Sequence, residues 1–111
     1  MEIIAMLEKI CKLNDLTPLV GVPALVQGEQ VAVFRLNDGN VYAVSNFDPF
    51  SQANVISRGI TGNLKGFDVV ASPIYKQHFD LRTGQCLEDD TVSIKTYPVK
   101  LEGDDVFIAH Q

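Results

Sequence analysis

The sequence has few of the side chains that bind metals in proteins, and those it has are far apart. It contains two cysteines, Cys11 and Cys86, and two histidines, His78 and His110. Zinc and iron–sulfur sites usually take such ligands in pairs that are only a few residues apart. No pair of this kind occurs here, so the sequence argues against a metal site built from cysteine and histidine.

A basic run and a long apolar segment are also missing. The formal net charge is -5 and the sequence pI is about 4.8, which argues against nucleic acid or an anionic membrane as a partner. The longest apolar runs, such as Val31 to Phe34, are far too short to span a bilayer. Met1 to Ile10 lacks the basic start and the small-residue cleavage site of a signal peptide. We therefore expect a cytoplasmic protein in which both cysteines stay reduced.

The length of 111 residues suits one domain, which we expect to span residues 1–111. Residues 1–7 are the segment in which a flexible tail is expected. Met1 to Ile10 is the best candidate for a short helix. No part of the chain has a sustained helical period, so little helix is predicted.

Short apolar runs separated by turn residues predict an all-β fold, an antiparallel sandwich or barrel. The strongest hairpin signal is Asn37-Asp38-Gly39-Asn40, because Asp and Gly tolerate the backbone angles of tight turns. Further turns are predicted at residues 27–29, 83–84 and 102–104. The expected strands are Leu7 to Leu13, Val22 to Val26, Val31 to Leu36, Val41 to Ser45, Phe67 to Ser72, Phe79 to Leu81, Tyr97 to Leu101 and Val106 to Ala109.

The middle of the sequence, from Asn46 to Gly66, has no clear period. One short helical turn is expected at Val55-Ile56. A loop of this length inside a compact domain is usually functional. We therefore expect the functional residues in or near this segment.

Two short segments resemble the metal-binding loops of Rieske iron–sulfur domains. Those domains hold a [2Fe–2S] cluster with Cys-x-His on one loop and Cys-Pro-x-His on the next, followed by a Phe and a Thr-Gly turn. Here Asp48-Pro49-Phe50 occupies the first pattern and Ser72-Pro73-Ile74-Tyr75 the second. Phe79 to Gly84 matches the downstream segment. The residues around the ligand positions match the Rieske pattern, but the four ligands themselves are replaced by Asp48, Phe50, Ser72 and Tyr75.

This combination resembles the small subunit of assimilatory NAD(P)H-dependent nitrite reductase. The segments Ser45 to Phe50, Val55 to Gly59 and Val70 to Pro73 are typical of that family, and the resemblance extends from about Glu8 to Ile108. It implies a Rieske-like fold with the two loops at one tip. It also implies a large catalytic subunit that holds FAD, sirohaem and an iron–sulfur cluster and reduces nitrite to ammonium. The chain itself would bind no cofactor, would not be catalytic alone, and would stabilise or position that partner.

The chemistry of the four replacements agrees with the loss of the cluster. Iron in such clusters needs thiolate sulfur or imidazole nitrogen. Phe50 has no lone pair, Ser72 and Tyr75 offer neutral oxygens, and the single carboxylate of Asp48 cannot hold two irons. We expect the rings of Phe50 and Tyr75 to pack between the two loops, because an unfilled cavity would be destabilising.

The predicted interface with the partner consists of Phe50, Arg58, Tyr75 and Lys76, since an apolar centre with a charged rim suits protein recognition. A catalytic site at Asp48, Ser72 and Tyr75 would need a base, and neither loop contains a histidine, so no catalytic residue is predicted. Two alternatives remain open. One is a scaffold module of the same fold without a redox role, and the other is an electron-transfer ferredoxin, which would be coloured.

Overall fold

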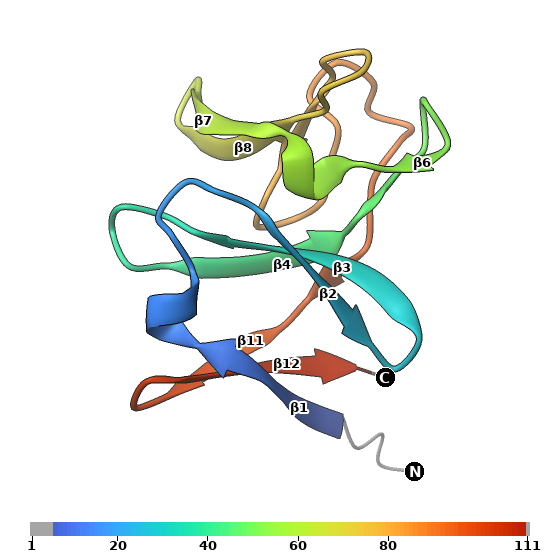
Figure 1. Cartoon of the computed structure of the whole chain (residues 1–111). Coiled ribbons are helices and arrows are strands. Elements are labelled where there is room, and N and C mark those ends of the chain that lie inside the picture. The colour runs from blue at the N-terminus through green and yellow to red at the C-terminus, as the bar shows by residue number, and fades with distance from the viewer. Residues whose placement is uncertain (1–5, 111) are drawn as a thin grey trace, which may run out of the picture.

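A four-stranded antiparallel sheet runs through the middle of the protein, whose computed structural model describes residues 6–110. The hairpin at residues 37–40 forms as predicted, and Gly39 supplies its positive φ of +90°. In Figure 1 this sheet lies between a lower sheet near both chain ends and an upper region with the loops. The strand order of the middle sheet is β10 (Thr96–Tyr97), β4 (Val41–Ser45), β3 (Glu29–Arg35) and β2 (Val22–Val26).

Three smaller antiparallel sheets and two short 3-10 helices complete the fold of the described residues. Within residues 6–110 no helix has the length or the apolar character to cross a membrane. The lower sheet has the order β1 (Met6–Lys12), β12 (Asp105–His110) and β11 (Val99–Glu102). The upper sheet has the order β7 (Ile60–Leu64), β8 (Phe67–Ala71) and β9 (His78–Asp80). A short hairpin joins β5 (Phe47–Asp48) to β6 (Ala53–Asn54), and the helices are η1 (Leu13–Asp15) and η2 (Ile56–Arg58).

Strand β3 is buried on both faces, which explains the continuous apolar run from Val31 to Phe34. Successive side chains of a strand point to opposite faces, so even-numbered residues enter one core and odd-numbered residues the other. The tip cluster, toward the loops, consists of Ala32, Phe34, Leu36, Val44, Ile56, Val70, Phe79, Leu81, Cys86 and Ile94. The base cluster, toward the lower sheet, consists of Leu16, Val26, Val31, Val33, Ala43, Tyr97, Val106 and Ile108.

The predicted all-β class and antiparallel pairing are confirmed, with several differences in the elements. The single strand expected from Tyr97 to Leu101 is divided into β10, which pairs with β4, and β11, which pairs with β12. The prediction of a short helix in Met1 to Ile10 is wrong for its second half, because residues 6–12 form β1, which pairs with β12. The expected flexible tail therefore excludes Met6 and Leu7, and residues 1–5 lie outside the described part of the chain. The segment from Asn46 to Gly66 contains strands β5, β6 and β7, none of which was predicted. The helical turn expected at Val55-Ile56 is found as η2.

Both cysteines are free thiols, as expected. Cys86 is buried in the tip cluster, and Cys11 packs against the base cluster. Burial raises the pKa of both thiols, so they are protonated and unreactive at neutral pH.

Candidate functional site

The first tip loop follows β4 and is fixed at its start by Asn46. This side chain is buried, and its Oδ1 accepts a hydrogen bond of 2.7 Å from the backbone amide of Ser57. Its backbone carbonyl accepts a bond of 3.1 Å from the amide of Ile56. The loop between β4 and η2 is therefore pinned at both ends, and the β5–β6 hairpin projects from a fixed base.

Asp48 lies at the end of β5 and is fully buried. Its Oδ1 accepts a hydrogen bond of 3.0 Å from the amide of Phe50, and its Oδ2 one of 2.9 Å from the Ser51 hydroxyl. Its backbone carbonyl accepts a bond of 2.7 Å from the amide of Gln52, which closes the turn. A buried carboxylate is stable only when donors surround it, and this loop supplies two of them.

The third donor to Asp48 comes from the second tip loop, which connects β8 to β9. Ser72 is 1% exposed, and its hydroxyl donates a hydrogen bond of 2.5 Å to Asp48 Oδ2. The backbone amide of Ser72 donates a hydrogen bond of 2.9 Å to the Gln77 carbonyl, and its hydroxyl oxygen accepts one of 3.3 Å from the Ile74 amide. The side chains at the two cysteine positions of the Rieske pattern thus join the loops directly.

This arrangement does not fit a [2Fe–2S] cluster. Asp48 and Ser72 are in hydrogen-bond contact across the space that a cluster would have to occupy. They present a carboxylate and a neutral hydroxyl, which are poor substitutes for two thiolates. Among residues 6–110 no group of three His, Cys, Asp or Glu side chains is placed to hold a metal ion.

The two aromatic replacements lie in different environments. Phe50 is half-buried and packs on the tip cluster, with its ring centroid 6.2 Å from that of Phe79. Tyr75 is 61% exposed, so the prediction that both rings pack between the loops is wrong for Tyr75. The two loops are instead joined by the hydrogen bond between Asp48 and Ser72.

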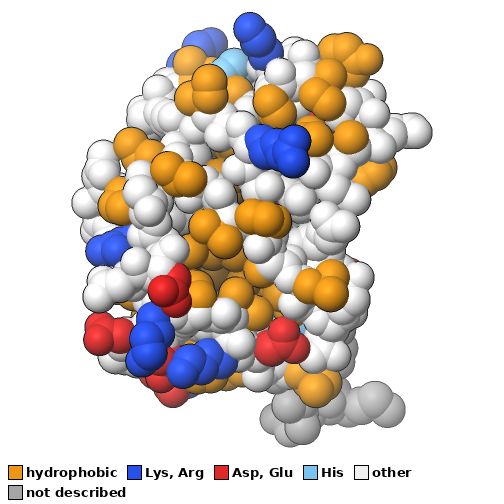
Figure 2. All heavy atoms as spheres, viewed as in Figure 1, with side chains coloured by type: hydrophobic (Ala, Val, Ile, Leu, Met, Phe, Trp, Pro, Cys, Tyr) orange, Lys and Arg blue, Asp and Glu red, His pale blue; other side chains and the backbone are white. Residues whose placement is uncertain are grey.

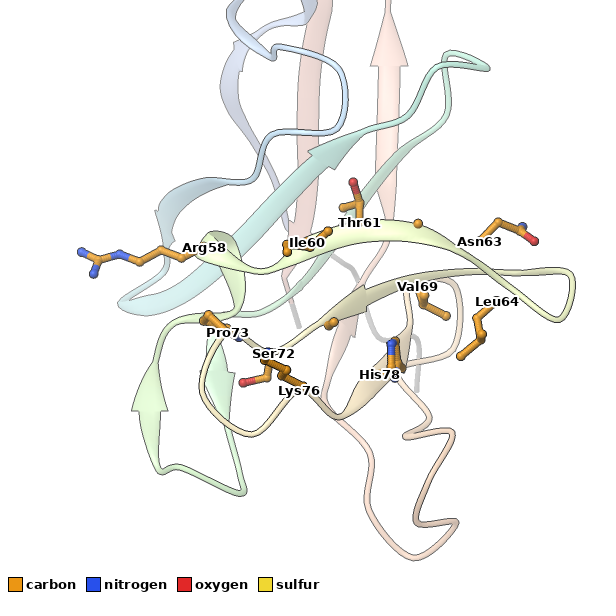
Figure 3. A pocket seen from close by; sticks show the side chains of 12 residues that line it. Arg58, Ile60, Thr61, Asn63, Leu64, Val69, Ser72, Pro73, Lys76 and His78 are labelled. Atoms are coloured by element: carbon orange, nitrogen blue, oxygen red, sulfur yellow. The ribbon is translucent and has the colours of Figure 1, made fainter.

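The structure brings together two of the four predicted interface residues. Arg58, at the end of η2, and Lys76, in the second loop, both line a hollow of about 510 Å³ on the outer face of the upper sheet. Figure 3 shows Arg58 extending outward from the end of η2 and Lys76 beside Ser72 in the second loop. Phe50 and Tyr75 are not among the residues that line this hollow.

A polar network at the other end of the molecule was not predicted. The carboxylate of Glu29 accepts hydrogen bonds from Tyr97 Oη at 2.5 Å, His110 Nε2 at 2.6 Å and Lys95 Nζ at 3.2 Å. These residues are 66 to 81 positions away in the sequence, so no local pattern could have revealed the network. The bonds from Tyr97, His110 and Lys95, in that order, lower the pKa of Glu29 to about 2. Burial and the nearby carboxylate raise the pKa of the Tyr97 hydroxyl.

The Glu29 network predicts an acid-dependent loss of stability. Because its pKa is lower in the folded state than the ordinary 4.5, Glu29 stabilises the fold above that pH. This contribution is lost as the pH falls from 4.5 toward 2. We expect Glu29→Gln to lower the melting temperature at neutral pH, and the difference from wild type to shrink below pH 4.5. Glu102→Gln, at an exposed glutamate on β11, is the control, and a Glu29→Gln deficit that persists unchanged at pH 2.5 would contradict the assignment.

Comparison with known proteins connects this geometry to a family. The Rieske-like [2Fe–2S] domain family matches residues 7–109. The nitrite reductase (NADH) small subunit of Salmonella typhimurium is 46% identical over 96 residues, which cover 86% of this chain and 89% of that one. The solution structure of the Escherichia coli protein NirD is 40% identical, with a TM-score of 0.88 over 96% of this chain and 98% of that one. The nitrite reductase [NAD(P)H] large subunit of Klebsiella oxytoca is 38% identical over 104 residues, which are 94% of this chain but 11% of that one.

Proposed function

The chain belongs to the Rieske-like [2Fe–2S] domain family, and from this premise we propose that it is the cofactor-free small subunit of an NAD(P)H nitrite reductase. One structural observation supports the proposal independently of the sequence similarity. At the two cysteine positions, Asp48 and Ser72 form a buried hydrogen bond where a redox domain of this fold would hold its cluster. The chain keeps the architecture of an electron carrier and has lost the means to carry electrons.

The partner that we propose is the large catalytic subunit, with FAD, sirohaem and an iron–sulfur cluster as its prosthetic groups. The similarity to part of a Klebsiella oxytoca chain named as a large subunit supports this pairing, because a domain of this family there shares one polypeptide with the rest of that chain. We place the complex in the cytoplasm, in keeping with two free thiols. The role left to this chain is to stabilise or position the large subunit through contacts at the tip.

Co-expression with and without this chain tests the proposal. We expect the two subunits to co-purify, and the large subunit expressed alone to show a lower melting temperature and slower nitrite-dependent oxidation of NAD(P)H. The small chain purified alone should show no visible absorption band and no stoichiometric iron or acid-labile sulfide. Equal activity and stability of the large subunit in both preparations would contradict the supporting role. Iron and sulfide in the isolated small chain would contradict the cofactor-free assignment.

A further inference from the structure

The outer face of the upper sheet is lined by apolar side chains, and one of them, Ile60, projects into solvent within the described residues 6–110. Ile60 pairs with Ala71 and Gly62 with Val69, so these residues share one face, while the alternate residue Val70 points into the tip cluster. A sheet face exposed to water normally carries polar side chains. Here Ile60 is 78% exposed, which is unusual for a large aliphatic side chain unless another molecule covers it.

This face is hollowed rather than flat. The hollow of about 510 Å³ has a floor formed by aliphatic side chains of β7 and β8. Figure 3 shows Leu64, Val69 and His78 on the same side of the sheet, with Pro73 and Lys76 in the loop at its end. A concave apolar surface of this size can bury two or three side chains of a partner.

The charge around the hollow has one sign. The charged side chains that line it are Arg58 and Lys76, with His78 beside them, and no aspartate or glutamate is among the lining residues, although the chain has a net charge of -5. His78 is already held by Glu88 at 2.7 Å, whereas neither Arg58 nor Lys76 makes an ion pair within residues 6–110. On the face shown in Figure 2, acidic side chains gather in the lower half, and the upper half carries basic and hydrophobic ones.

We propose that this hollow is the docking site for a segment of the large subunit that carries aliphatic or aromatic side chains next to at least one carboxylate. The inference rests on the proposed function and specifies the surface through which it operates. The apolar floor supplies the area to be buried, and Arg58 and Lys76 supply the charges that orient the segment. An acidic segment is favoured because a basic one would find no carboxylate in the hollow.

Gly62 gives a direct way to test the site. It lies in β7 on the floor of the hollow, and a Cβ atom added there would meet no atom within 4 Å. Its φ is not in the left-handed region, so a larger residue fits the strand without backbone strain. A bulky side chain at this position fills the hollow while leaving the fold unchanged.

The experiment measures the affinity of the large subunit for variants of the full chain. We expect Gly62→Trp and the double variant Arg58→Glu/Lys76→Glu each to weaken binding by about tenfold or more. Lys100→Glu reverses a single charge on β11, in the lower sheet, which is half the charge change of the double variant, and should alter the affinity by less than about twofold. Melting temperatures of all variants should stay close to that of wild type, which shows that any loss of binding is local.

The outcomes separate this inference from the proposed function. Failure of the wild-type chain to bind the large subunit would contradict the proposed function itself. Binding of the wild-type chain with equal affinity for the Gly62→Trp and charge-reversed variants would leave that function intact and overturn the docking site. Sedimentation of the chain alone as a dimer that Gly62→Trp dissociates would also overturn it, since the hollow would then hold a second copy.

Discussion

Replacing Gly84 with alanine is expected to lower the free energy of unfolding by about 3–5 kcal/mol. Gly84 has a φ of +82°, which alone makes alanine unfavourable by about 1–2 kcal/mol. The larger part comes from contact, because a Cβ atom there would overlap the carbonyl oxygen of Ile94. The Ile94 amide donates a hydrogen bond of 2.8 Å to the Gly84 carbonyl, so relief of the overlap would break this bond and displace Ile94 from the tip cluster. Urea denaturation measures the loss.

Gly39→Ala is the matched control for this substitution. Gly39 has a similar φ of +90°, but nothing lies within 4 Å of a Cβ atom added there. Its alanine variant should lose only about 1–2 kcal/mol, which isolates the backbone contribution. Domains of this size are stable by roughly 5–15 kcal/mol, so Gly84→Ala removes a large fraction of the total and Gly39→Ala does not. Equal losses in the two variants would show that the contact with Ile94 is unimportant.

Replacing Asp48 with alanine is expected to cost about 3 kcal/mol of stability. The variant would leave the hydroxyls of Ser51 and Ser72 and the amide of Phe50 without their acceptor, at a site where Ser72 is buried and the other two residues are partly buried. Ser72→Ala removes only one of these donors and should cost about 1–2 kcal/mol. The same urea titration measures both variants.

The double variant tests whether the bond between Asp48 and Ser72 holds the tip together. The sum of the stability losses of the two single variants should exceed the loss of the double variant by about 1–2 kcal/mol, because each single substitution removes the same bond. Asp38→Ala is the control, since Asp38 also accepts a backbone amide hydrogen bond but lies in an exposed turn. It should cost less than about 1 kcal/mol. Strictly additive losses at Asp48 and Ser72 would show that their contact contributes no coupling.

The parts of the fold that the sequence predicts are those with a local signal. The turn at residues 37–40 and the strand Val22–Val26 are found where they were expected, because turn residues mark the first and a short apolar run that ends at a turn marks the second. Strand β7 was missed for a physical reason. It contains Gly62 and Asn63, which are uncommon in strands, so the five residues do not carry the β-branched and aromatic composition that marks a strand.

The candidate site was predicted in position but not in geometry. The sequence places Asp48 and Ser72 at the two cysteine positions, yet their mutual hydrogen bond depends on how the loops after β5 and β8 approach each other. The expectation for Tyr75 assumed that two rings were needed between the loops, whereas Tyr75 is exposed and the loops are joined by polar side chains. The hollow on the outer face of the upper sheet could not be predicted, because it requires the pairing of β7 with β8.

Strand β3 has a mechanical consequence for the tip. Its even-numbered side chains belong to the tip cluster and its odd-numbered ones to the base cluster, so a single backbone is the common wall of both cores. Neither core can open by itself without uncovering the other. A partner bound at the tip loops therefore contacts a surface that is rigidly connected to the rest of the molecule.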